Sequence, residues 1–221
     1  MTLAQAKKRV DAIFKKYVAG LPAASLIPPK AVAGKLYEAV VLGYVVENLV
    51  RREHLQLSLV GGTKLYLKTA PGPINPTYPH IAVFQSGAHV ANLFTDVEFT
   101  TLSCLLGGNP APCSPGDCHE LDLVMVDASA TGRPVPPQIW LAVECKHTAY
   151  KKSLLRESLG VRRELGLLTN PPVATRFQQW PATTVPAKPP ACLMVCCSDP
   201  NVYAFAGPGA VFGITFHHVP I

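Results

Sequence analysis

Apolar residues recur every three to four positions in two segments near the start of the chain, which is the spacing of a helix. Residues 3–18 predict an amphipathic helix, with Thr2 as a candidate N-cap. Residues 34–53 are apolar over most of their length, so they predict a second helix that is largely buried. The positions of this helix that we expect to face the core are Leu36, Val40, Gly43, Val46 and Val50.

Shorter apolar runs, bounded by turn residues, predict strands after these helices. Residues 55–68 predict two short strands that form a hairpin around the Gly61-Gly62 pair. Residues 80–103 predict two further strands, which are joined by a turn at Ser86-Gly87. We therefore expect antiparallel pairing in this part of the chain.

Three later apolar runs are nearly continuous, as expected of strands that are covered on both faces. They span residues 119–127, 139–147 and 191–197, and residues 149–168 between the last two predict a basic amphipathic helix. One or two short elements close the chain. This order predicts a single α/β domain over residues 1–221, with a mixed central sheet flanked by helices and a hairpin inserted between the first core helix and the core strands.

Composition agrees with a globular chain. Of the 221 residues, 48% are hydrophobic and only 15% are charged, which excludes the composition of a disordered protein. The net charge of +6 permits a polyanionic partner. No apolar run is long enough to span a membrane, and the first residues lack the apolar core of a signal peptide. With seven cysteines, an odd number, we expect free thiols and a cytoplasmic location.

Charged residues gather where two of the predicted strands begin or end. Side chains alternate along a strand, so Glu144 and Lys146 share one face, as do Glu120 and Asp122. If the two strands are neighbours, three carboxylates and one amine converge. A hard divalent cation relieves the repulsion between carboxylates, and Mg²⁺ prefers oxygen ligands. The pattern predicts a Mg²⁺ site, at which we expect Mn²⁺ to substitute, with a lysine that positions or deprotonates an attacking water and stabilises a phosphate.

These and neighbouring residues permit three other interpretations. Glu144 and Lys146 could form a structural ion pair at a strand end. Cys113, Cys118 and His119 could hold zinc, but their spacing matches no common pair of ligands. Cys145 and His147 share a face and could form a thiol hydrolase site, but no third partner and no oxyanion-binding group are visible.

The segments "ELD" (120–122) and "ECK" (144–146) resemble the motifs of the PD-(D/E)xK nuclease superfamily, which has the restriction-endonuclease-like fold. The order of predicted elements over residues 34–200 is similar to that family as well. The sequence differs in having Leu121 where the family name has proline. The segment "GKLYEAVVLGYV" looks like the first helix of the family, and Glu38 matches its acidic position.

The resemblance implies a role for each of these residues. Asp122 and Glu144 would ligate Mg²⁺, with the carbonyl of Cys145 as a further ligand. Lys146 would orient the hydrolytic water. Glu38 would bind the metal through water or complete a second metal site. Glu120 would lie beyond the residues that bind the metal directly. Two more acidic residues, Asp96 and Glu98, are either site residues or polar positions on an edge strand.

The predicted basic helix offers a surface for nucleic acid. Lys151, Lys152 and Arg156 at its start are candidates for phosphate contacts, unless this face is simply solvated. The next candidates are Arg162, Arg163, Lys7, Lys8, Lys15 and Lys16.

Together these features predict a Mg²⁺-dependent endonuclease that acts on DNA, with RNA as an open alternative, in restriction or defence. The alternative is a catalytically silent nucleic-acid-binding or assembly module on the same fold. We expect a homodimer, since cutting both strands of a duplex needs two active sites, or a partner subunit that supplies specificity.

Overall fold

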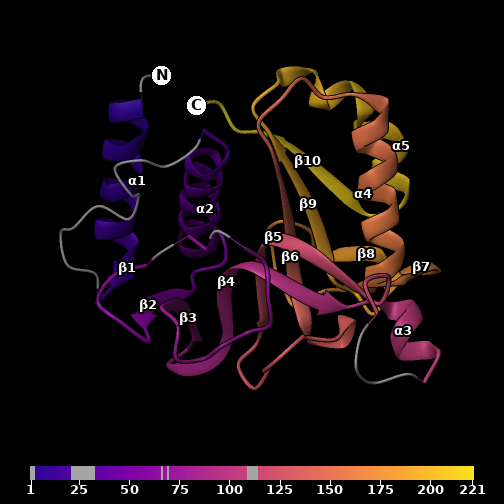
Figure 1. The fold of residues 1–221 in the computed structure, drawn as a ribbon, viewed down its shortest axis with the longest axis horizontal. Coiled ribbons are helices and arrows are strands. Elements are labelled where there is room, and N and C mark those ends of the chain that lie inside the picture. Colours follow the sequence, from indigo (N-terminus) through magenta and orange to yellow (C-terminus); the bar gives the residue numbers. More distant parts are fainter. Residues whose placement is uncertain (1–2, 21–32, 66, 69, 109–113) are drawn as a thin grey trace.

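A mixed eight-stranded sheet runs through the molecule, with helices on both of its faces (Figure 1). The computed structural model describes residues 3–20, 33–65, 67–68, 70–108 and 114–221. The proposed cap Thr2 and the proposed zinc ligand Cys113 lie outside these residues. The expected α/β class with a mixed central sheet is confirmed.

The strands of the large sheet follow the order β1-β2-β3-β4-β5-β6-β9-β10. Strands β2 to β6 form an antiparallel series, whereas β1 is parallel to β2 and the trio β6, β9 and β10 is parallel. The strands are β1 (Val18–Ala19), β2 (Gln56–Val60), β3 (His80–Gln85), β4 (Ala88–Thr100), β5 (Cys118–Asp127), β6 (Ile139–Lys146), β9 (Cys192–Cys197) and β10 (Ile214–His218). A second, two-stranded sheet pairs β7 (Leu167–Ala174) with β8 (Thr184–Lys188).

Helices α1 and α2 lie on one side of the sheet, and α4 and α5 lie on the other (Figure 1). The α-helices are α1 (Leu3–Tyr17), α2 (Ala33–Arg51), α3 (Leu102–Leu106), α4 (Lys152–Leu165) and α5 (Ala206–Val211). Two 3₁₀ helices are η1 (Pro136–Gln138) and η2 (Pro200–Phe205). In the described part of the chain, no helix combines the length and the apolar character needed to cross a membrane.

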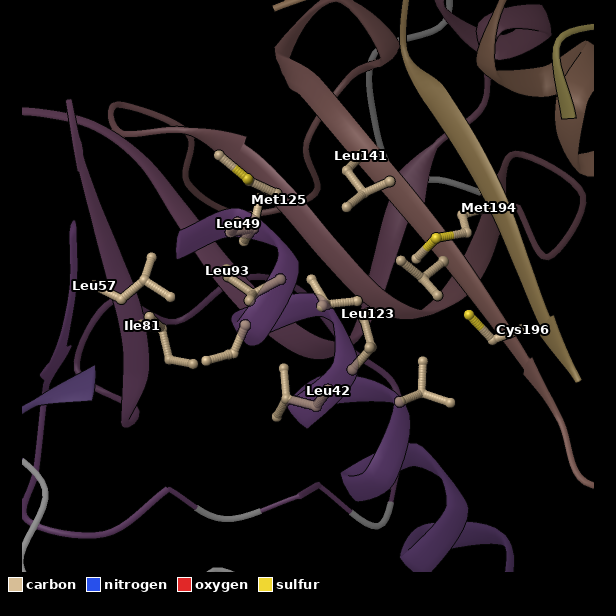
Figure 2. Packing of buried hydrophobic residues seen from close by; sticks show 14 of the residues in the cluster. Leu42, Leu49, Leu57, Ile81, Leu93, Leu123, Met125, Leu141, Met194 and Cys196 are labelled. Atoms are coloured by element: carbon tan, nitrogen blue, oxygen red, sulfur yellow. The ribbon is translucent and has the colours of Figure 1, made fainter. Parts of the chain in front are cut away.

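Helix α2 is buried because its apolar residues surround it on most sides. Of the five positions expected to face the core, four are buried and Val50 is partly buried. Figure 2 shows Leu42 and Leu49 of this helix among the side chains of the central strands. On its other side α2 packs against α1, where Gly43 leaves room for Ile13. Because α2 packs against both the sheet and α1, the residues near its N-terminal end have a defined position over the sheet.

Two hairpins were predicted in this part of the chain, and one of them forms. The turn at Ser86-Gly87 joins β3 to β4 as expected, and both of its residues adopt positive φ angles, of 50° and 82°. The hairpin expected around Gly61-Gly62 is wrong: a strand forms at β2, but the described residues of 61–68 contain no second strand. β2 pairs with β3 instead. The apolar residues Leu65 and Leu67 pack into the α2 core without joining the sheet.

Candidate active site

The site begins where β5 and β6 separate. Their antiparallel register ends at the pair Leu123 and Val143. One residue further, the Asp122 carboxylate accepts a hydrogen bond from the backbone N–H of Cys145, with 2.6 Å between Oδ2 and N. A side-chain oxygen thus takes the place that a backbone carbonyl holds along the rest of the ladder. The carboxylate is thereby fixed beside the "ECK" segment.

Glu144 and Lys146 share one face of β6, as alternation predicts. The Lys146 Nζ lies 2.9 Å from Glu144 Oε2 and 2.7 Å from Oε1 of Glu157, which belongs to α4. Glu144 is only 6% exposed, whereas the Glu157 side chain is half-exposed. Lys146 therefore joins the buried end of β6 to the helix that follows it.

Burial dominates the electrostatics of both carboxylates. Burial raises the pKa of Glu144 to about 7, although the nearby charge of Lys146 lowers it. Burial also raises the pKa of Asp122, against the hydrogen bond from Cys145 and the charge of Lys146. The charge of Asp122 further raises the pKa of Glu144, so the two carboxylates interact electrostatically.

Lys146 remains a cation in this arrangement. Burial alone would lower its pKa, but the charges and hydrogen bonds of Glu144 and Glu157 outweigh that effect and raise the pKa above its usual value. A protonated amine donates hydrogen bonds and accepts none. Lys146 can thus orient a water or stabilise a negative phosphate, and it does not act as a base in this state.

Helix α2 and strand β4 bring a second group of charges to the site. The Lys35 Nζ lies 2.8 Å from Glu38 Oε2 and also donates to Asp96 Oδ1. Burial raises the pKa of Glu38 to about 7, with the hydrogen bond from Lys35 acting in the opposite direction. The charges of Asp96 and Asp122 raise it further, which connects this group to the first one.

Asp96 has an unusual conformation for a strand residue. Its φ is 51°, in the left-handed region that Asp tolerates better than most residues do. Phe94 and Val97 lie on either side of it and belong to the same core cluster, so the alternation of the strand is broken here. The side chain is 1% exposed, and its Oδ2 has no hydrogen-bond partner among the described residues. A strained, buried carboxylate of this kind is typical of functional sites.

Two residues that pair with the site lysine or carboxylates, Lys35 and Glu157, were not predicted from the sequence. Lys35 lies one helical turn before Glu38, so the spacing of the pair was a usable signal. Glu157 had no such signal, because it is 11 positions from Lys146 and the two meet only through the packing of α4 on the sheet.

Burial raises the pKa of Glu120, and the charges of Asp122 and Asp96 raise it further, so this residue lies at the edge of the group. Glu120 is exposed and pairs across the sheet with Glu98, whose carboxylate binds Arg133 at 2.8 Å. Lys151, Lys152 and Arg156 are exposed, as a phosphate-binding surface requires.

Arg162, a reserve candidate for nucleic-acid contacts, is wrong in that role. It is buried and donates to the carbonyl of Ala191 at 2.6 Å, because this face of α4 turns toward the sheet. Its neighbour Arg163 is exposed.

The thiol interpretation of Cys145 finds no support in its surroundings. Burial raises the pKa of this thiol well above its usual value, which disfavours the reactive thiolate. The imidazole of His147 stacks on Tyr37 with 5.2 Å between ring centroids, and its Nδ1 contacts the hydroxyl of Ser198. The Tyr37 side chain on α2 is buried, whereas His147 follows β6 and is exposed.

The candidate ligands at the site are carboxylate oxygens, which hard cations prefer. Within the described residues, no three His, Cys, Asp or Glu side chains are grouped closely enough to hold a metal by themselves. Mg²⁺, however, is usually bound by one or two carboxylates together with waters and substrate oxygens. Asp122 and Glu144 supply two carboxylates, and Oδ2 of Asp96 has no hydrogen-bond partner among the described residues. These residues fit a water-rich Mg²⁺ site better than a closed cage.

Comparison of the chain with protein-family models, curated proteins and solved structures finds no match.

We expect Glu38→Gln to flatten the dependence of stability on pH. The raised pKa means that the folded protein resists ionising Glu38, so the free energy of unfolding falls as pH rises from about 5 to about 8. Glutamine imitates the neutral form. The variant should match wild type near pH 5 and exceed it near pH 8 by about 1–3 kcal/mol.

Chemical denaturation at several pH values measures this difference. Glu47→Gln is the control, since Glu47 lies on the same helix in a more exposed pair with Arg51. If Glu38→Gln and wild type change in parallel over this pH range, Glu38 does not have a raised pKa.

Proposed function

We propose that this protein is a Mg²⁺-dependent endonuclease that hydrolyses phosphodiester bonds in DNA, with the site arrangement of the PD-(D/E)xK superfamily. The observation that carries the proposal is the meeting of Asp122 with Glu144 and Lys146 where two adjacent strands part. The mixed sheet between helices, with Glu38 directed to this place from α2, supports a restriction-endonuclease-like fold.

In this proposal Asp122 and Glu144 hold the cation directly, with the Cys145 carbonyl as a further ligand and Glu38 acting through water. When bound, Mg²⁺ supplies Lewis-acid stabilisation of phosphate charge and a more acidic water. The buried carboxylates have pKa values raised toward neutrality, so a cation also favours their ionised forms.

Lys146 contributes a fixed positive charge beside these ligands. Because Glu144 and Glu157 hold its amine from two sides, its position is set before substrate arrives. A preorganised cation stabilises the transition-state charge without further reorganisation. Glu157 is thus a positioning residue in this scheme.

DNA would approach along the start of α4. Lys151, Lys152 and Arg156 are exposed. They lie 5 to 10 positions after the end of β6, so the chain holds them near the site. Contacts of this kind give affinity to phosphates without reading sequence. We therefore assign sequence choice, in a restriction or defence role, to a homodimer or to a partner subunit.

The second candidate is a nucleic-acid-binding module without activity. It is favoured by the engagement of Lys146 with two carboxylates, which occupy two of the three N–H donors of its amine and leave one for a water or a phosphate. Incubation of plasmid DNA with protein and Mg²⁺ separates the two candidates. Nicked or linear plasmid supports the enzyme, and a mobility shift without cutting supports the module.

Lys146→Ala should reduce cleavage by about 10²–10³-fold while DNA binding stays near wild type. The substitution removes the cation that faces the scissile phosphate but adds no bulk. Glu144 loses its partner and can take up a proton, since its pKa is already raised.

Single-turnover cleavage of plasmid and a filter-binding assay measure the two quantities. Lys188→Ala, at an exposed position at the end of β8, is the matched control, and thermal melts establish that both variants are folded. Activity within a few-fold of wild type would remove Lys146 from the mechanism.

Asp122→Asn should abolish stabilisation by Mg²⁺ and preserve the fold. The amide oxygen of asparagine can still accept the Cys145 N–H, and a neutral group is less costly to bury than a carboxylate. Wild type should gain about 2.7 kcal/mol at a Mg²⁺ concentration 100 times its Kd.

Thermal melts with and without Mg²⁺ test this expectation. Asp127→Asn, at the other end of β5, is the control, because Asp127 binds Trp140 Nε1 away from the site. A wild-type Mg²⁺ shift in Asp122→Asn would exclude Asp122 as a ligand.

Replacing Lys151, Lys152 and Arg156 together by alanine should weaken DNA binding equally for all sequences. Each lost phosphate contact should reduce the slope of log K against log salt by about 0.9. Fluorescence anisotropy over a salt series measures this slope. The comparison variant replaces Lys8, Lys15 and Lys16 of α1, which are exposed as well. A slope that changes only in the α1 variant would move the DNA surface to that helix.

A further inference from the structure

The segment between β2 and β3 forms a cavity of about 580 Å³. This volume lies within the range that is usual for ligand sites. The lining has apolar groups, one amide, one cation and one aromatic ring, and none of its described residues is acidic. These groups belong to Leu67, Lys68, Pro71, Pro73, Asn75 and Tyr78. The lining therefore suits a ligand that combines a flat ring with negative charge.

Lys68 is a half-buried cation without a direct counter-ion. It forms no ion pair within the described residues, and its Nζ lies 5.9 Å from the centroid of the Tyr78 ring. Burial lowers the pKa of Lys68, and the charge of Asp96 acts in the opposite direction. Its Nζ is not one of the buried polar atoms that lack a partner, so a ligand in the cavity can reach its N–H donors.

Tyr78 presents an exposed ring on a fixed backbone. The residue is 50% exposed, although an aromatic ring gains from burial. Its N–H donates to the Asn75 carbonyl at 3.0 Å, and its carbonyl accepts from Nδ1 of His80 at 2.8 Å. Gly61 packs so closely on the same carbonyl that a Cβ there would lie 2.5 Å from the oxygen. The ring is thus a preorganised surface on which a ligand can stack.

The cavity adjoins the candidate active site. The carbonyl of Gly72 in its wall accepts from the N–H of Glu98 at 2.9 Å, and Gly72 forms a bridge with Val97. Asp96 precedes Val97 on β4, and its carboxylate accepts from Lys35 in the second group of charges at the site. The wall of the cavity is therefore attached to β4 directly beside the carboxylates.

From these observations we propose that the cavity holds one unpaired nucleotide of the DNA strand being cleaved, with its base on Tyr78 and its phosphate on Lys68. This inference rests on the proposed nuclease function and specifies its substrate: DNA in which a nucleotide near the cleaved bond is unpaired or is extruded from the duplex. Bases within a duplex are stacked on one another, and extruding one costs free energy. An unpaired base can stack on any accessible aromatic ring.

Binding is measured first, in EDTA, with two DNA duplexes of the same sequence that differ only in one bulged iodouracil nucleotide. Wild type should bind the bulged duplex at least about fivefold more tightly, the lower end of what the stacking of one base contributes. On irradiation, iodouracil couples to an aromatic ring on which it is stacked, so the crosslink should map to Tyr78. Equal binding of the two duplexes, or a crosslink to another part of the chain, overturns the proposal.

Variants separate the ring from the charge. Tyr78→Ala should lose both the preference and the crosslink, whereas Tyr78→Phe should keep both because it retains the ring. Lys68→Ala should reduce the slope of log K against log salt by about 0.7, the value for one phosphate contact on a single strand. Lys64→Ala, at an exposed position of the same segment, is the control and should match wild type. An unchanged preference in Tyr78→Ala overturns the proposal.

Addition of Mg²⁺ distinguishes this proposal from the nuclease function on which it rests. Wild type should cleave the bulged duplex faster than the paired one, and Tyr78→Ala should cleave the two at equal rates. Cleavage of both duplexes at equal rates by wild type overturns the substrate preference and leaves the nuclease function in place. A crosslink at Tyr78 without cleavage of either duplex supports the nucleotide-binding cavity and contradicts the nuclease function.

Discussion

The hydrogen bond from the Cys145 N–H to Asp122 is the constraint on which the candidate site depends. It ends the backbone ladder between β5 and β6 and inserts a carboxylate at the point of separation. Because the donor belongs to the residue between Glu144 and Lys146, the bond fixes Asp122 relative to both. A buried carboxylate with one firm hydrogen bond keeps acceptor capacity for another partner. The same hydrogen bond therefore stabilises the fold and positions a carboxylate that can bind another partner.

Much of the fold followed from hydrophobic spacing alone. The buried helix α2 and the apolar strands β5, β6 and β9 have strong local patterns, and each formed close to its predicted range. The hairpin around Gly61-Gly62 failed for a different reason. Its sequence specified a turn, but the β2 edge was available to β3, and pairing with β3 places β2 within a larger sheet. Residues that favour a turn do not reveal whether a strand further along the chain will pair with the same edge.

The candidate site was predictable where the residues lie on neighbouring strands and, through the family resemblance, at Glu38 of α2. Alternation correctly placed Glu144 with Lys146, and the strand order brought Asp122 beside them. The left-handed Asp96 was beyond reach, because a single φ angle reverses which face a strand residue occupies. Glu157 was also beyond reach, since its contact depends on how α4 docks on the sheet. Arg162 shows the same limit, because a basic amphipathic pattern does not reveal which arginine faces inward.

Helix α4 is the element in which these effects combine. Its start presents exposed cations, its first turns hold Glu157 against Lys146, and its last turns bury Arg162 beside an apolar cavity. At both ends the fold keeps charges in places where burial is costly: carboxylates with raised pKa values at one end, and a guanidinium with unpartnered N–H groups at the other. Native proteins rarely retain such costs without a compensating partner. The buried groups near the two ends of α4 therefore have opposite charge: carboxylates near its start and a guanidinium in its last turn.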